Sequence, residues 1–310
     1  MFEMLLLSKK KIAGVVPFAW FAGGYMADSV DISTSEKYLY DSNTVIPGNS
    51  LSLARFCMTS CGNAVGGIAT GGFTMSDQQH QAVTDKLNYA TGVVSMGTEL
   101  SEPLEGPAAA GTVQVGLIAA GGNNAGFRLY SKWYTYSNDV MTSGANLITP
   151  RYLLGAVGNS TVAYFAGGHM KSAKTTILTS AAERYVYAGN VVTSSASLSI
   201  ARSFIGACGN TEYGILAGGF NNIADHSVTE KYTYATNTLT QATSLPFSIS
   251  CLAGAGNTEF ALFAGGDSST VVSNQTLKRA YATETYVAGS SLSTPRANAA
   301  PLSSTPGWIG

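Results

Sequence analysis

A pair of adjacent glycines recurs six times along this chain at nearly even spacing, and this recurrence restricts the fold more than any other feature. Successive pairs begin 48, 50, 46, 51 and 47 residues apart: Gly23-Gly24, Gly71-Gly72, Gly121-Gly122, Gly167-Gly168, Gly218-Gly219 and Gly265-Gly266. A period of this length marks a supersecondary unit that buries its apolar face only against neighbouring copies. The sequence therefore predicts a repeat architecture.

The most regular unit covers residues 201–246 and divides into four short strands. Two apolar runs flank a Gly209-Asn210 turn, and the second run ends at Gly218-Gly219. A polar loop, an alternating run over 229–234 and a last short run over 238–243 follow. Glycine-asparagine pairs between apolar runs are hairpin signals. Four antiparallel strands with a glycine pair predict one blade of a β-propeller.

The two ends of the chain complement each other in this scheme. The first unit has no strand before its glycine pair that matches the first strand of the other units, whereas residues 297–304 form a surplus copy of that strand. We expect the surplus strand to complete the first blade and to close the ring, which removes the exposed sheet edges. The prediction is an all-β, six-bladed β-propeller over residues 16–310, preceded by an N-terminal arm over residues 1–15.

Three segments carry a resemblance to a known family: LSLARFCMTSCGNAVGGIATGGF (51–73), TPRYLLGAVGNSTVAYFAGG (149–168) and TEKYTYATNTLT (229–240). They resemble kelch-type repeats, and they are most similar to those in tail-fibre and other virion proteins of tailed bacteriophages. The resemblance implies a phage tail protein that is made in the host cytoplasm. Two departures are the missing fourth-strand tryptophan of eukaryotic kelch repeats and the junctions at 99–110 and 245–251, which lack an arginine.

Composition argues against several classes of partner. Only 11% of the residues are charged and the net charge is −1, whereas phosphate-driven binding of nucleic acid needs clustered positive charge. The uncharged run over 12–27 is shorter than the roughly 20 residues that a bilayer requires, so we expect no membrane insertion. Residues 1–7 are apolar apart from Glu3 and precede the lysines at 9–11, an order that argues against a secretory signal peptide.

The candidate binding residues lie in the loops between the second and third strands of each unit, which differ in length and content. Variable loops on a rigid scaffold are where binding sites usually occur. Most of these side chains are neutral donors and acceptors, which suit a carbohydrate or a protein surface; the alternative is that they are only solvated. They are Gln78, Gln79, His80, Asn123, Asn124, His169, Lys171, Asn221, Asn222, Asp225, His226 and Asp267.

Four arginines precede first strands and should surround the mouth of the central channel: Arg55, Arg151, Arg202 and Arg296. Two interpretations are open. The guanidinium groups clamp an anionic ligand by bidentate hydrogen bonds, or each binds carbonyl groups of its own connection and belongs to the fold.

Metal and cofactor sites are not expected. His80, His169 and His226 belong to different units and have no carboxylate or cysteine at ligand spacing. Cys57, Cys61, Cys208 and Cys251 form no CxxC pair, and we interpret them as small core residues rather than disulfide partners or zinc ligands.

Enzymatic activity is not predicted either. No GxSxG motif occurs, and paired carboxylates of the kind that a glycosidase needs are not expected. Alternation in third strands such as TEKYTY (229–234) places both tyrosines in the core and the charged residue directly before them on the other side. We expect the acidic residues of these strands to lie mostly on the outward side.

The predicted function is a non-enzymatic virion tail module that attaches the phage to a host glycan or outer-membrane protein through the variable loops. The alternative is a structural or decoration protein that contacts only other virion proteins. In both cases the N-terminal arm would dock onto other virion proteins. The light charge and high glycine content favour close packing between copies, so we expect a homo-oligomer.

Overall fold

The computed structural model describes residues 16–172, 175–268 and 271–305. The N-terminal arm that we predicted over residues 1–15 lies outside the described residues. Over these residues the fold consists of β-strands together with two short 3-10 helices, η2 (Ala27–Ser29) and η3 (Tyr187–Gly189). The all-β prediction is confirmed. Within the described ranges, no helix is long and apolar enough to cross a membrane.

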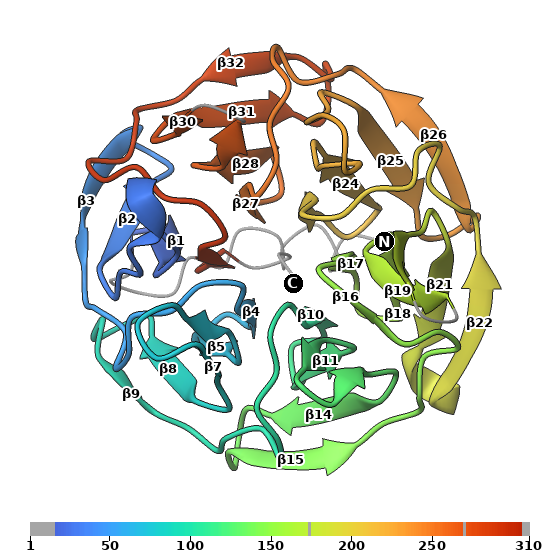
Figure 1. The fold of residues 1–310 in the computed structure, drawn as a ribbon. Helices are drawn as coiled ribbons and strands as arrows, with labels where there is room; N and C mark the ends of the chain where they lie inside the picture. Colours follow the sequence, from blue (N-terminus) through green and yellow to red (C-terminus); the bar gives the residue numbers. More distant parts are fainter. Residues whose placement is uncertain (1–15, 173–174, 269–270, 306–310) are drawn as a thin grey trace, which may run out of the picture.

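The principal strands form six four-stranded antiparallel sheets arranged radially around a central axis (Figure 1). We number the sheets 1 to 6 and call their strands first to fourth from the axis to the rim. Sheet 1 contains β33 (Ala300–Ser303), β1 (Phe18–Ala22), β2 (Ser35–Leu39) and β3 (Thr44–Gly48); sheet 2 contains β4 (Thr59–Gly62), β5 (Gly66–Thr70), β8 (Thr84–Asn88) and β9 (Val94–Met96); sheet 3 contains β10 (Ala108–Gly111), β11 (Val115–Ala119), β14 (Ser131–Thr135) and β15 (Val140–Ser143). Sheet 4 contains β17 (Gly155–Gly158), β18 (Val162–Ala166), β21 (Ala182–Val186) and β22 (Val191–Ser195); sheet 5 contains β23 (Gly206–Gly209), β24 (Tyr213–Ala217), β25 (Thr229–Thr233) and β26 (Thr238–Ala242); sheet 6 contains β27 (Ala253–Gly256), β28 (Phe260–Ala264), β31 (Thr276–Ala280) and β32 (Tyr286–Ala288).

The connections divide between two faces of the molecule. The loop face carries the connections from second to third strands, over the described residues 23–34, 71–83, 120–130, 167–172, 175–181, 218–228, 265–268 and 271–275, and the turn face carries the tight turns within each sheet. Short strands extend the loop face: β6 (Phe73–Thr74), β7 (Gln79–His80), β12 (Gly122–Asn123), β13 (Gly126–Phe127), β16 (Arg151–Tyr152), β19 (His169–Ser172), β20 (Thr175–Leu178), β29 (Asp267–Ser268) and β30 (Val271–Val272).

The apolar core lies between neighbouring sheets. Each of the six adjoining pairs of sheets encloses a cluster of buried side chains, including the pair formed by sheets 6 and 1. Close to the axis there is little room, so first strands are rich in alanine and glycine. A Cβ atom on Gly254 would lie 2.4 Å from the carbonyl oxygen of Ala207 in the neighbouring sheet. The predicted core role of the four cysteines agrees with their burial.

The glycine pairs link each sheet to the next. The second glycine takes a positive φ, as Gly24 does at 94°, which suits a residue without a side chain. Its N–H group donates to a carbonyl oxygen of the following sheet, from Gly24 to Arg55 at 2.9 Å and from Gly266 to Arg296 at 2.9 Å. In sheet 3 these roles fall to Ala120 (φ 64°) and Gly121, one residue earlier than the glycine pair predicts.

The C-terminal strand pairs with the first strand of the described chain. Strand β33 lies antiparallel to β1, with Ala300 opposite Ala22 and Ser303 opposite Ala19. All five residues of β1 are buried. The N- and C-terminal parts of the chain therefore share one sheet.

The third strands bury the tyrosines that we assigned to the core. Tyr134 and Tyr232 each donate a hydrogen bond of 2.6 Å to the turn residue five positions later, Asp139 or Asn237. Sheet 6 replaces this pair by Arg279 and Glu284, which form an ion pair of 3.3 Å. Sheet 6 thus keeps a polar link between its third strand and the turn with different residues, whereas sheet 2 has Leu87 and Gly92 at these positions.

Candidate functional site

The four arginines that we considered for a ligand clamp are buried and paired. Each forms an ion pair with an acidic residue on the third strand of its own sheet: Arg55 with Asp85 (2.9 Å), Arg151 with Glu183 (3.1 Å), Arg202 with Glu230 (2.8 Å) and Arg296 with Glu36 (3.0 Å). The arginine side chains are at most 1% exposed. No guanidinium surface remains for a ligand, so we remove the four from the candidate binding residues.

These arginines also form hydrogen bonds with the glycine pairs. Each donates to the carbonyl oxygen of the first glycine, as Arg55 does to Gly71 at 2.9 Å and Arg202 to Gly218 at 2.9 Å. Our second interpretation, in which the arginines belong to the fold, accounts for these contacts. The prediction that the acidic residues of the third strands face outward is wrong, because Glu36, Asp85, Glu183 and Glu230 are all buried.

The two sheets without such an arginine also lack the acidic partner. Sheet 3 has Leu104 and Lys132 at the two positions, and sheet 6 has Ile249 and Leu277. A buried charge without its partner is costly. Arginine and carboxylate are therefore present together or absent together in all six sheets.

A ring of backbone hydrogen bonds, which we call the collar, surrounds the channel at the loop face. Its members come from the segments before the first strands, and each N–H group donates to the carbonyl oxygen of the preceding member: Cys57 to Asn298, Gly106 to Cys57, Leu153 to Gly106, Phe204 to Leu153, Cys251 to Phe204 and Asn298 to Cys251, at 2.8–3.2 Å. All six members have positive φ values of 51–58°. Every sheet contributes one of them.

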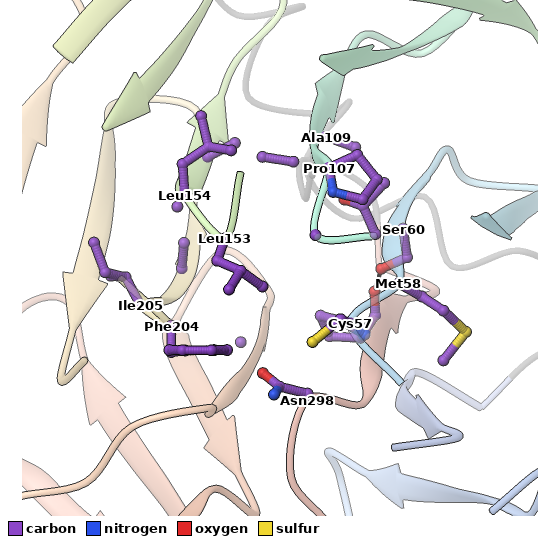
Figure 2. A pocket seen from close by; sticks show the side chains of 18 of the residues that line it. Cys57, Met58, Ser60, Pro107, Ala109, Leu153, Leu154, Phe204, Ile205 and Asn298 are labelled. Carbon is purple, nitrogen blue, oxygen red and sulfur yellow. Dashed lines mark hydrogen bonds between the residues drawn. The ribbon is translucent and has the colours of Figure 1, made fainter. Parts of the chain in front are cut away.

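The collar side chains narrow the channel. Figure 2 shows Cys57, Leu153, Phe204 and Asn298 converging on one opening from different sheets. Below the collar the channel is small, with a cavity of about 120 Å³.

A larger cavity of about 510 Å³, which we call the mouth pocket, opens above the collar on the loop face. Its floor contains Cys57, Phe204, Cys251 and Asn298 from the collar. Its walls are aromatic and acidic: Tyr25, Phe56 and Phe220 together with Glu105, Asp225 and Asp267. Within the described part of the chain, the lining residues come from sheets 1, 2, 3, 5 and 6 and include no lysine or arginine.

Polar contacts fix several of these groups. The Tyr25 hydroxyl donates to Asp267 at 2.8 Å, and burial raises the pKa of Tyr25. The Glu105 carboxylate lies 3.6 Å from Nδ1 of His80. Burial raises the pKa of Glu105, although the nearby His80 opposes that shift. The pocket therefore combines apolar ring surfaces with carboxyl groups in different environments.

Replacing Glu105 by glutamine should alter how stability depends on pH. Because the folded-state pKa of Glu105 is raised, the folded protein binds this proton more tightly than the unfolded chain does, and the stability contribution of the group falls as pH rises above about 4.3. Below that pH both states hold the proton. The unfolding free energy of the wild type minus that of Glu105→Gln should decline in urea titrations as the pH rises above about 4.3, the pKa of the group in the unfolded chain.

A difference that stays flat over that range would contradict the burial effect. Glu99→Gln, at an exposed position, is the control for removing a carboxylate of the same type.

Of the twelve loop residues that we predicted, only Asp225 and Asp267 line the mouth pocket. His80 and Asn124 contact each other at 3.2 Å outside it. Asn123 binds Glu102, and Lys171 lies over the Phe127 ring. The remaining predicted residues are spread over the loop face and do not line the pocket: Gln78, Gln79, His169, Asn221, Asn222 and His226.

The three histidines remain apart. His169 is 9% exposed and packs against Tyr152, and burial lowers its pKa. Over residues 16–172, 175–268 and 271–305, no group of three histidine, cysteine or acidic side chains is placed to hold a metal ion.

Sequence reasoning missed most of the pocket. Tyr25, Phe220 and Asp267 hold one repeat position, immediately after the glycine pair, and Glu105 immediately precedes a collar member. What these pocket residues share is their position in the repeat and not their residue type. Reading each copy at that position would have found three pocket residues on three sheets.

Comparisons with known proteins support the fold. No family model matches the sequence, and no curated protein matches it either. Among solved structures, the structure of YjhT superposes with a TM-score of 0.72 at 12% sequence identity, covering 89% of this chain and 98% of that one. The likeness shows that the chain has a β-propeller fold.

The same comparison corrects the prediction that this chain is not an enzyme. The likeness to YjhT contradicts that prediction. Its premise about outward acidic residues also fails, since the third-strand acids are buried and three other carboxyl groups share the mouth pocket. At 12% identity the likeness carries the fold alone, and we assign no reaction.

Proposed function

We propose that this chain is a kelch-type propeller of six blades, closed by β33, that attaches a bacteriophage tail to a neutral glycan on the host surface. The six sheets would be the blades. The pairing of β33 with β1 and the hydrogen bonds of the collar support this arrangement. The similarity of the repeats to those of phage virion proteins supports the location.

The mouth pocket is the observation on which the glycan assignment rests. Phe204 and Phe220 are only partly buried and offer apolar ring surface at the cavity. Pockets for small ligands are typically apolar with a few convergent polar groups. The faces of sugar rings present C–H groups that match aromatic surfaces, and sugar hydroxyls donate to carboxylates, which accept several hydrogen bonds.

The acidic lining of the mouth pocket disfavours negatively charged glycans. Among the described residues, Glu105, Asp225 and Asp267 line the pocket without a lysine or arginine, and the nearby arginines are neutralised in buried pairs. A sialylated or phosphorylated sugar would bring a like charge close to these carboxyl groups. The pocket therefore favours neutral or amino sugars.

Phe220→Ala should weaken glycan binding about thirtyfold or more, because truncating an aromatic hot-spot residue costs about 2 kcal/mol or more. Asp267→Asn should weaken it less, by removing a charged acceptor. The measurement is binding of fluorescently labelled protein to an array of bacterial surface oligosaccharides, followed by titration of the best glycan.

Phe127→Ala is the matched control, since Phe127 lies on the same face in β13 but outside the pocket. Equal loss of binding in Phe127→Ala would move the site away from the mouth pocket. If folded wild-type protein bound neither array nor host cells, the attachment proposal would fail and the structural virion role would take its place.

A further inference from the structure

One position of the repeat places an aromatic ring between two sheets on the turn face. The first residue of the second strand is Phe18 in sheet 1, Tyr213 in sheet 5 and Phe260 in sheet 6. Each ring meets a tyrosine of the following sheet edge to face, with ring centroids 5.3–5.6 Å apart: Phe18 with Tyr89, Tyr213 with Tyr281 and Phe260 with Tyr40.

A lysine from the third strand of the same sheet covers each of these rings. The ammonium nitrogens of Lys37, Lys231 and Lys278 lie 4.6, 5.4 and 5.2 Å from the ring centroids. A cation over an aromatic face is attracted by the ring quadrupole. Lysine, ring and tyrosine therefore form one repeated arrangement.

Sheet 2 keeps the lysine and the tyrosine but lacks the ring. Gly66 stands at the ring position, Lys86 pairs with Ile68 across the neighbouring strands, and Tyr136 belongs to sheet 3. Sheets 3 and 4 differ in both places, with Val115 and Val162 instead of a ring and Trp133 and Arg184 instead of lysine. Among the six sheets, all described at these positions, sheet 2 alone retains the lysine without a side chain beneath it.

A groove of about 580 Å³ occupies this place between sheets 2 and 3, which are neighbours in Figure 1. Gly66, Ile68, Lys86, Leu87 and Tyr136 line it. Asp139 of sheet 3 holds the Lys86 ammonium at 2.5 Å, so the cation is positioned beside the groove.

The lips of the groove are apolar and exposed. Val65 and Val113 line it and are 67% and 61% exposed. The groove is on the turn face, opposite the mouth pocket, so both sites can be occupied together.

We propose that this groove binds a tyrosine or phenylalanine side chain of a partner polypeptide. Two observations support this proposal. The lysine ammonium is attracted to the face of an aromatic ring, and in sheets 1, 5 and 6 a lysine and a tyrosine enclose such a ring of the chain itself. In sheet 2 the lysine and the tyrosine are both present around an open space. A ring of the ligand would occupy the space that Phe18, Tyr213 and Phe260 fill in the other sheets, because Gly66 has no side chain there. The proposal is independent of the glycan site, because it uses other residues on the other face.

The test uses N-acetyl-L-tyrosinamide as the ligand and N-acetyl-L-leucinamide as the apolar comparison, titrated into full-length protein labelled with nitrogen-15. The amide resonances of Gly66, Gly67 and Lys86 should shift saturably with the tyrosine compound and far less with the leucine compound. Lys86→Met should weaken binding by about two- to fivefold, the effect of an exposed cation–π contact. Lys86→Arg, which keeps the charge, should retain binding.

Lys37→Met is the matched control, since it makes the same change over a position already filled by Phe18. It should leave the titration unchanged. Unshifted groove resonances, or equal binding of the leucine compound, would overturn the proposal. Shifts in the free protein that vanish on dilution would identify a second copy as the occupant and also overturn it. Glycan binding on the array stays unaffected in every case, which separates failure here from failure of the proposed function.

Discussion

Arg55→Ile is expected to lower the free energy of unfolding by about 3–5 kcal/mol, the usual cost of leaving one member of a buried ion pair without its partner. Arg55 is 0% and Asp85 1% exposed, and their charged atoms lie 2.9 Å apart. After the substitution Asp85 keeps the Ser52 N–H group as a hydrogen-bond donor, at 3.1 Å, but loses the guanidinium. Unfolding in urea, followed by circular dichroism, measures the loss.

The double variant Arg55→Ile with Asp85→Leu should recover at least about half of that loss, since replacing a whole buried pair by apolar residues is often close to neutral. Sheet 6 supplies the precedent, with Ile249 and Leu277 at these positions. Lys231→Gln, which breaks a pair exposed by 28% and 34%, is the control and should cost about 1 kcal/mol or less. A double variant no more stable than Arg55→Ile would contradict the coupling.

Leu302→Asp should cost about 4 kcal/mol or more, because it buries an unpaired charge. Leu302 is 0% exposed in β33 and packs with Phe18, Trp20 and Leu87 in the cluster between sheets 1 and 2. A substitution nine residues from the end of the chain, counted inclusively, would then destabilise the whole fold. Thermal unfolding followed by circular dichroism measures the effect.

Ser291→Asp, at an exposed position in the connection before β33, is the control and should be nearly neutral. If Leu302→Asp were as mild as the control, the C-terminal strand would contribute little to sheet 1. The proposed ring closure would then lose its main energetic support.

The fold was predictable where structure follows from local pattern. Glycine pairs, Gly-Asn turns and alternating third strands each act within a few residues, so they identify strands and turns from one copy. The exception is sheet 3, where Ala120 adopts the left-handed conformation with φ of 64°. An alanine in that conformation leaves no mark in the sequence, and the adjacent Gly121-Gly122 pair shifted our register by one residue.

The candidate site was less predictable because it depends on how separate copies converge. Asp225 and Asp267 were identified from loop variability, whereas Tyr25 and Phe220 looked like ordinary apolar residues after a glycine pair. The buried pairs left a usable signal: Arg55 and Asp85 are 30 residues apart, and units that lack one member lack the other. Which of the equivalent loop side chains reach the axis follows from the three-dimensional arrangement of the sheets.

In the collar, the hydrogen bonds that join neighbouring sheets do not depend on which side chains line the channel entrance. All six of its bonds run from main-chain N–H to main-chain carbonyl, and the six residues differ in size and polarity: asparagine, cysteine, glycine, leucine, phenylalanine and cysteine. Only the left-handed backbone conformation restricts the choice. Single substitutions at these six positions can therefore change the side chains that line the channel entrance while the backbone hydrogen bonds of the collar stay in place.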